Sequence, residues 1–122
     1  MIQLARILCP VDFTEFSERA YAYAYSLARH YGAKLFVQHA AEPLLTLYRS
    51  YASAPMIEEM YKLQMADVEE RMDRLIQKYP AGAVEIEPVI QVGPASDLIL
   101  VLAEEKEVDL IAMGTHGRRG LD

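Results

Sequence analysis

The sequence predicts an α/β fold, an open and mostly parallel β-sheet with helices on both faces. Two observations indicate this fold. Short apolar runs alternate with longer segments whose apolar residues recur every three or four positions, giving the order β-α-β-α-β-α-β. The first two runs are separated by one helical segment, which is the spacing of a βαβ unit with a right-handed crossover. The 122 residues suffice for one domain, and we expect it to span residues 1–122.

The first βαβ unit begins near the N-terminus. Residues Leu4–Val11 are mostly apolar, as in a central strand buried on both faces. Thr14 is the expected N-cap of the following helix, and Gly32 is its expected end. The apolar stripe of this helix is expected at Phe16, Ala20, Tyr23, Leu27 and Tyr31. Residues Lys34–His39 form the second predicted strand.

The alternation continues in the second half of the chain. A connection over residues 40–54 leads to a long helix predicted over Pro55–Tyr79, where apolar residues again recur every three or four positions. Residues Val84–Gln91 alternate apolar and acidic side chains and contain a proline, which indicates an edge strand. A third helix is expected to begin at Pro94, and Val108–Met113 is the last predicted strand.

Composition and charge disfavour several classes of protein. The net charge of −6 argues against a nucleic-acid or anionic membrane partner. No run approaches the roughly 18 apolar residues of a membrane span, and Arg6 interrupts the N-terminal apolar stretch, so no signal peptide is expected. The single cysteine, Cys9, excludes an internal disulfide and suits a reducing compartment. We therefore expect a cytoplasmic protein.

A glycine-rich stretch follows the last predicted strand. Gly114, Gly117 and Gly120 recur at every third position, with Arg118 and Arg119 among them. Glycines after a buried strand let the backbone approach a ligand, and their N–H groups can point at an anion. The spacing is neither that of the dinucleotide fingerprint nor that of the Walker loop. The stretch is therefore either a phosphate contact or an ordinary flexible turn.

Asp12 follows the first strand, at the same predicted edge of the sheet as Gly114. Ligands of open parallel sheets bind at the carboxyl ends of strands where the strand order reverses, and there we expect these two residues to be neighbours. The Asp12 carboxylate could accept hydrogen bonds from a ribose or an adenine amine, or it could serve only as a turn residue. No residue pair resembles a nucleophile with its base, and the histidines show no metal-ligand spacing. The residues indicate binding more than catalysis, with no catalytic residue and no metal site.

Four stretches of the chain match the pattern of a known family. They are Ile7–Ser17, Val37–Ala40, Gly93–Ala95 and Asp109–Gly120, of which the last is the most specific. Together they resemble the universal stress protein family, over essentially the whole chain. The resemblance implies a Rossmann-like sheet with strand order 3-2-1-4-5. It also implies a homodimer, because the fifth strand commonly forms the dimer interface in that family.

The resemblance implies an ATP site. ATP-binding members carry a glycine, two residues, a second glycine, nine residues, and then a glycine followed by serine or threonine. The matching positions are Gly114 and Gly117 for the first glycine pair, Asp12 for the nucleoside, Pro10 and Val11 beside the adenine, the Ala40 backbone at the adenine edge, and Met113 and Thr115 near ribose and phosphate. From the residues of this loop themselves, Arg118 or Arg119 could add positive charge for a phosphate. The implied cofactor is ATP, with or without Mg²⁺.

The second half of that motif would lie beyond Asp122. We therefore expect the sequence to be part of a longer protein, without the C-terminal helix and the fifth strand. The fourth strand would then keep an unpaired edge and an uncovered apolar face. In the glycine stretch, Gly120–Asp122 are expected to be the least ordered residues.

Three functional hypotheses follow from the residues and the resemblance. The first is an ATP-binding regulator in the stress response, with at most slow ATP hydrolysis. The alternative is a dimerisation or adaptor module of the same fold that binds no nucleotide and uses the long acidic helix as a partner surface. The weakest is an adenylyl-transferring enzyme of a related α/β superfamily, disfavoured because no nucleophile and base are evident.

Overall fold

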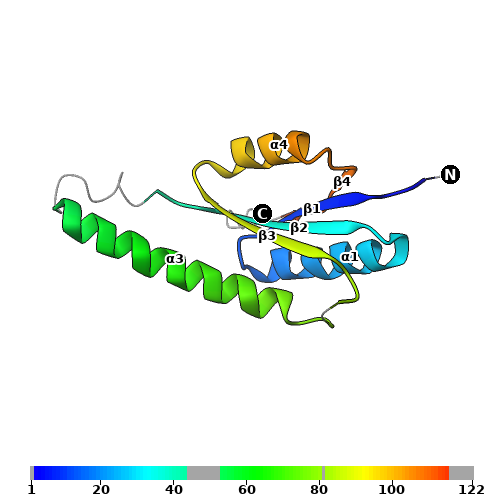
Figure 1. Cartoon of the computed structure of the whole chain (residues 1–122), viewed down its shortest axis with the longest axis horizontal. Helices are drawn as coiled ribbons and strands as arrows, with labels where there is room; N and C mark the ends of the chain where they lie inside the picture. Colours follow the sequence, from blue (N-terminus) through cyan, green and yellow to red (C-terminus); the bar gives the residue numbers. More distant parts are fainter. Residues whose placement is uncertain (1, 44–52, 81, 116–122) are drawn as a thin grey trace.

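The computed structural model describes residues 2–43, 53–80 and 82–115. Its four parallel strands form one sheet in the order β3-β2-β1-β4. The strands are β1 (Arg6–Pro10), β2 (Lys34–Ala41), β3 (Ile86–Val92) and β4 (Leu110–Ile111). The helices in this part of the chain are α1 (Glu15–Tyr31), α3 (Ala54–Ile76) and α4 (Ala95–Glu105). Helices α1 and α3 lie on one face of the sheet and α4 on the other (Figure 1), which confirms the predicted α/β fold.

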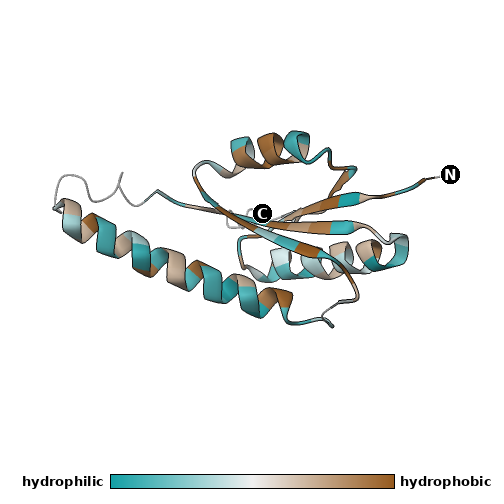
Figure 2. Ribbon diagram, in the orientation of Figure 1, coloured by the Kyte–Doolittle hydropathy of each residue, from teal (hydrophilic) through white to brown (hydrophobic). Residues whose placement is uncertain are grey.

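The core lies on both faces of β1 and β2. Successive side chains of a strand point to opposite faces, so each central strand contributes to two apolar clusters. The larger cluster packs against α1 and α3 and contains Ile7, Cys9, Leu35, Val37, Tyr21, Met72 and Leu75. The smaller one joins Leu8 and Phe36 to Leu102 of α4. Figure 2 shows apolar and polar residues alternating along α3, as expected for a helix with one buried face.

Both predicted ends of α1 are confirmed. The Thr14 side chain accepts a hydrogen bond from the Ser17 N–H at 3.3 Å, as an N-cap does. Gly32 follows the helix at φ 67°, in the left-handed region that glycine adopts without strain. Acidic residues Glu15 and Glu18 occupy the first turn, where the helix dipole favours negative charge.

The buried face of α1 differs from the predicted stripe. Tyr23 is 73% exposed and Tyr31 is 41% exposed. The residues that α1 buries are Ser17, Ala20, Tyr21, Ala24, Tyr25 and Ala28. Alanines four residues apart allow the helix to approach the sheet closely, and the two tyrosine rings fill the space beside Tyr79. The positions of the small residues thus determine which face of α1 packs against the sheet.

The last predicted strand, Val108–Met113, is too long. Only Leu110 and Ile111 pair in the sheet, opposite Ile7 and Leu8 of β1. Within the described chain, β4 pairs with β1 alone, so only one neighbouring strand stabilises its extension. Ile111 of β4 and Met113 just after it are exposed. Among the described residues, β4 therefore has an unpaired edge and exposed apolar side chains, as expected.

The other boundaries shift by a few residues. Helix α3 ends at Ile76 rather than Tyr79, and Pro94 is the N-cap of α4 rather than part of its first turn. β3 lies at the sheet edge, as its proline predicts. None of the helices that the structure describes is long and apolar enough to cross a membrane.

Burial of Cys9 leads to a prediction about its reactivity. The side chain is fully buried, and this burial raises the pKa of the thiol from 9.0 to about 12. At about pH 9 the thiol of the unfolded chain is substantially ionised, whereas the folded thiol stays protonated. We expect iodoacetamide to alkylate Cys9 much more slowly in the native chain than in urea at this pH. Equal rates would contradict the buried position.

The same shift predicts how stability depends on pH. The folded-state pKa lies above that of the unfolded chain, so the contribution of Cys9 to the free energy of unfolding is complete below about pH 9. It is lost as the pH rises toward the folded value. A Cys9→Ala variant should show a weaker loss of stability over this interval than the parent chain.

Candidate functional site

A cavity of about 320 Å³ opens at the carboxyl ends of β1 and β2. Its wall combines the turn after β1, the end of β2 and one face of α3. The lining residues are Asp12, Phe13, His39, Ala40, Ala41, Glu42, Gln64, Asp67, Val68 and Arg71. The volume suits a small molecule or part of one, and the place is the sheet edge where open α/β folds bind ligands.

The turn after β1 is held by the Asp12 carboxylate. Asp12 Oδ1 accepts hydrogen bonds from the Thr14 backbone N–H at 3.0 Å and from the Thr14 hydroxyl at 2.5 Å. The Asp12 N–H donates to the Ser17 hydroxyl at 3.3 Å. Asp12 is therefore a turn residue, as one of the two interpretations of the sequence predicts. The residue also lines the cavity, so the turn fixes a carboxylate at its wall.

Phe13 and His39 form an aromatic part of the wall. Phe13 has φ 64°, a conformation uncommon for a residue other than glycine and often found at functional sites. Its ring lies 4.6 Å from the His39 ring, centroid to centroid, with a tilt of 35°. His39 Nδ1 lies 2.8 Å from the Val11 carbonyl oxygen, and because a carbonyl oxygen can only accept, Nδ1 is the donor of this hydrogen bond.

The backbone of Ala40 faces the space beyond the end of β1. Successive residues of a parallel strand present their N–H and C=O groups to opposite sides. The Gln38 carbonyl accepts from the Val11 N–H on the β1 side, and the Ala41 carbonyl accepts from the Gly93 N–H on the β3 side. Ala40 has the same orientation as Gln38, but the pairing with β1 stops at Gln38. The Ala40 N–H and C=O therefore point into the region of the cavity. β2 runs to Ala41, two residues beyond the predicted end.

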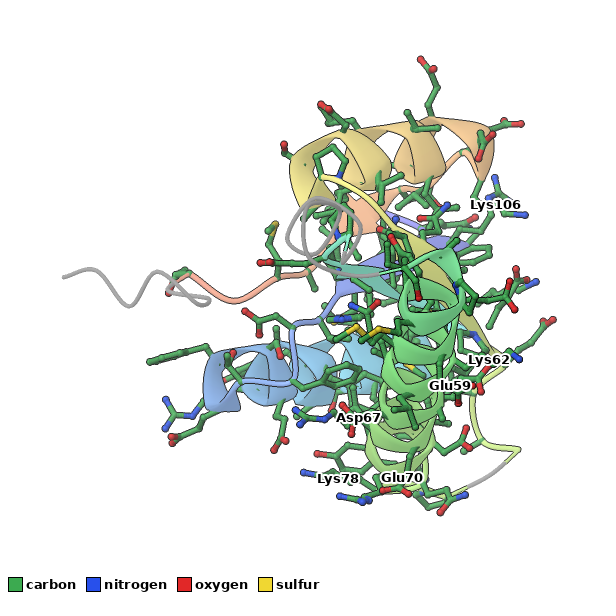
Figure 3. The ribbon with its side chains drawn as sticks, turned by 90° about the vertical axis from the view of Figure 1, so that its left-hand side faces the viewer. Glu59, Lys62, Asp67, Glu70, Lys78 and Lys106 are labelled. Carbon is green, nitrogen blue, oxygen red and sulfur yellow. The ribbon has the colours of Figure 1, made fainter. Side chains whose placement is uncertain are left out.

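Helix α3 supplies the outer wall. Gln64, Asp67, Val68 and Arg71 follow at helical spacings of three and four, so they share one face. The Gln64 side-chain Nε2 donates to the Glu42 carbonyl oxygen at 2.8 Å, which ties the helix to the end of β2. Arg71 Nε lies 3.1 Å from Asp67 Oδ2. Figure 3 shows Asp67 on the side of α3 toward α1, with Glu59 and Lys62 on the other side.

Among the described lining residues, acidic side chains outnumber basic ones. Asp12, Glu42 and Asp67 contribute carboxylates, and Arg71, the one guanidinium in this described part of the lining, is paired with Asp67. Such a wall attracts hydrogen-bond donors such as hydroxyl and amino groups and repels phosphates. Within the described ranges, no group of three or more His, Cys, Asp or Glu side chains could hold a metal ion.

Gly114 has a packing role of its own. A Cβ on this residue would lie 3.1 Å from both the carbonyl carbon and the oxygen of Phe16, in the first turn of α1. The Ala112 N–H donates to the Leu8 carbonyl at 2.9 Å, which holds the segment beside the carboxyl end of β1. Close packing against the α1 backbone therefore favours glycine at this position before any ligand is considered.

The structure brings some of the predicted site residues together. Asp12 and Ala40 line the cavity, whereas Pro10 and Val11 are buried behind it and do not line it. Met113 and Thr115 are exposed on either side of Gly114, in the segment that follows β4. The other predicted phosphate contacts, Gly117 and Arg118, and the residues Arg119 to Asp122 lie outside the described residues.

Sequence reasoning missed two parts of the wall. The pattern places His39 at the end of a strand without marking it as a site residue, although a polar ring at the end of a buried strand next to Asp12 is a signal of the site. The periodicity of the α3 residues predicts only a helix that covers the sheet. Their signal was weak, because Gln64, Asp67 and Arg71 border the apolar stripe in the way that solvated side chains of an amphipathic helix do.

The chain matches the profile of the "Universal stress protein family" over residues 4–122. It is 30% identical over 98 residues to universal stress protein A homolog 2 of Coxiella burnetii, covering 80% of this chain and 65% of the relative. It is 32% identical over 113 residues to a universal stress protein of Thermus aquaticus, covering 91% of this chain and 77% of the relative. The chain thus spans about two thirds to three quarters of the length of these relatives.

Solved structures agree with the fold. The universal stress protein UspA from Lactobacillus plantarum matches with a TM-score of 0.75 at 20% identity, covering 99% of this chain and 86% of that one. A universal stress protein solved in complex with cAMP matches with a TM-score of 0.60 at 27% identity, and the match covers 90% of this chain and 72% of that one. A universal stress protein family protein from Arabidopsis thaliana with AMP bound matches with a TM-score of 0.55 at 16% identity. This match covers 93% of this chain and 78% of that one.

Proposed function

The chain belongs to the universal stress protein family, and from the geometry of its cavity we propose that it binds an adenine nucleotide there. The observation that supports this proposal most is the meeting of two groups at the carboxyl ends of β1 and β2. These are the Asp12 carboxylate and the Ala40 backbone, which faces past the end of β1. The relative solved with cAMP supports an adenine nucleotide as the ligand class.

The proposed pose follows from the charge of the cavity. The nucleoside occupies the acidic cavity, where Asp12 accepts from ribose hydroxyls and the Ala40 backbone contacts the adenine edge. Pro10 and Val11 support the wall from behind. The phosphates extend away from the carboxylates toward Met113, Gly114 and Thr115. We include Gly117 and Arg118 as phosphate contacts, and ATP, with or without Mg²⁺, as the ligand in a nucleotide-dependent regulator of the stress response.

Calorimetric titration of ATP, AMP and UTP into the chain tests the proposal. UTP is the matched control, because it has the charge and the triphosphate of ATP without the purine. We expect ATP and AMP to bind with dissociation constants below the millimolar range and UTP to bind at least about tenfold more weakly, in line with the penalties for leaving buried polar groups unpaired. No binding at millimolar ATP, or equal binding of UTP, would overturn the adenine site.

Exposed apolar residues support a second candidate. Leu100 and Val101 are exposed on α4, and Ile111 and Met113 are exposed in β4 and just after it. Exposed apolar residues of this kind fit the dimerisation or adaptor module, in which the chain binds another protein and no nucleotide. The same titration separates the two proposals, since the adaptor binds none of the three nucleotides.

A further inference from the structure

Gln64 lines the cavity and carries a buried hydrogen-bond acceptor. Its Oε1 atom is buried and accepts no hydrogen bond from any residue that the structure describes. The orientation of the amide is fixed by chemistry, because Nε2 donates to the Glu42 carbonyl oxygen at 2.8 Å and a carbonyl can only accept. The amide oxygen, and not the amide nitrogen, is therefore the group in need of a partner.

A buried acceptor without a donor weakens the folded state or recruits a donor from outside the protein. The acidic wall already selects ligands that donate hydrogen bonds. Adenine has such a donor, the exocyclic amine at C6, next to the acceptor nitrogen N1. Guanine and hypoxanthine reverse this pattern, with a carbonyl oxygen at C6 and a protonated N1.

We propose that Gln64 Oε1 accepts a hydrogen bond from the 6-amino group of adenine and so makes Gln64 a specificity-determining residue of the cavity. The proposal rests on the nucleotide site proposed above. The bond from Gln64 to Glu42 places its amide at the end of β2, two residues beyond Ala40. The Ala40 N–H donor and the Gln64 acceptor then match N1 and the 6-amine of adenine. A 6-oxo purine would place acceptor against acceptor.

The experiment is a thermodynamic cycle between Gln64 and the 6-amine. ATP, inosine triphosphate and purine riboside triphosphate, which lacks any 6-substituent, are titrated calorimetrically into the chain and into Gln64→Met. Methionine keeps the length of the side chain and removes its acceptor. Gln77→Met is the matched control, because Gln77 is exposed at the C-cap of the same helix and does not line the cavity.

We expect the parent chain to prefer ATP over purine riboside triphosphate by about fivefold, the scale of one net hydrogen bond, and over inosine triphosphate by more. In Gln64→Met the ratio of the affinities for ATP and purine riboside triphosphate should fall to near one, while Gln77→Met should keep the ratio of the parent chain. A substitution that merely loosens α3 would weaken all three ligands equally and leave the preference intact.

The outcomes separate this inference from the proposed function. If ATP binds and the preference survives in Gln64→Met, the inference is wrong and the nucleotide site stands. If the parent chain binds none of the three triphosphates, the proposed function fails and the inference fails with it.

Discussion

Replacement of Asp12 by asparagine is expected to weaken ATP binding by about ten- to a hundredfold, the scale of a lost hydrogen bond to a charged group. The physical reason lies in the two roles of the carboxylate. Asp12 Oδ1 accepts from the Thr14 N–H and hydroxyl, and an asparagine oxygen can keep both bonds. The negative charge proposed to hold the ribose is lost. Calorimetry with ATP measures the change.

Asp73→Asn is the matched control for this prediction. Asp73 is exposed on α3 and does not line the cavity, so the same loss of one charge should leave the affinity within about twofold. Urea unfolding of Asp12→Asn should show that the turn survives. Unchanged ATP affinity in a folded Asp12→Asn variant would reduce Asp12 to a turn residue and remove it from the proposed site.

Replacement of Gly114 by alanine is expected to lower the free energy of unfolding by about 1–3 kcal/mol, as overpacking does, with no nucleotide present. The new Cβ would lie 3.1 Å from backbone atoms of Phe16. Backbone in the first turn of a capped helix cannot rotate away as a flexible side chain can. Urea unfolding in nucleotide-free buffer measures the loss.

Thr115→Ala is the control for the glycine variant. Thr115 is exposed and adjacent, and its truncation should change stability by less than about 0.5 kcal/mol. Equal stability of Gly114→Ala and the parent chain would mean that α1 does not approach this segment closely. The glycine would then be explained by the proposed phosphate contact alone.

Local signals predicted the elements of the fold well. A threonine before an apolar periodic segment and a glycine after it marked both ends of α1, because capping depends on residues close in sequence. The proline of β3 marked an edge strand for the same local reason. The buried face of α1 was predicted wrongly, since it depends on how closely Ala20 and Ala24 let the helix approach a sheet formed by distant residues.

The sequence predicted only those residues of the site that lie at the end of a single strand. Asp12 and Ala40 come directly from the ends of β1 and β2 and line one cavity. The α3 wall required the tertiary contact between Gln64 and Glu42, 22 residues apart in sequence, which no periodicity encodes. The packing role of Gly114 likewise depends on Phe16, almost a hundred residues earlier in the chain.

The most direct test of the central claim is a chemical-shift map of the ¹⁵N-labelled chain during titration with ATP. We expect the backbone amides of Asp12 and Ala40 and the side-chain amide of Gln64 to shift together with one saturation curve. Gly32, at the opposite end of the sheet, should not move. Shifts that avoid the cavity residues, or no shifts at saturating ATP, would contradict a nucleotide site at the carboxyl ends of β1 and β2.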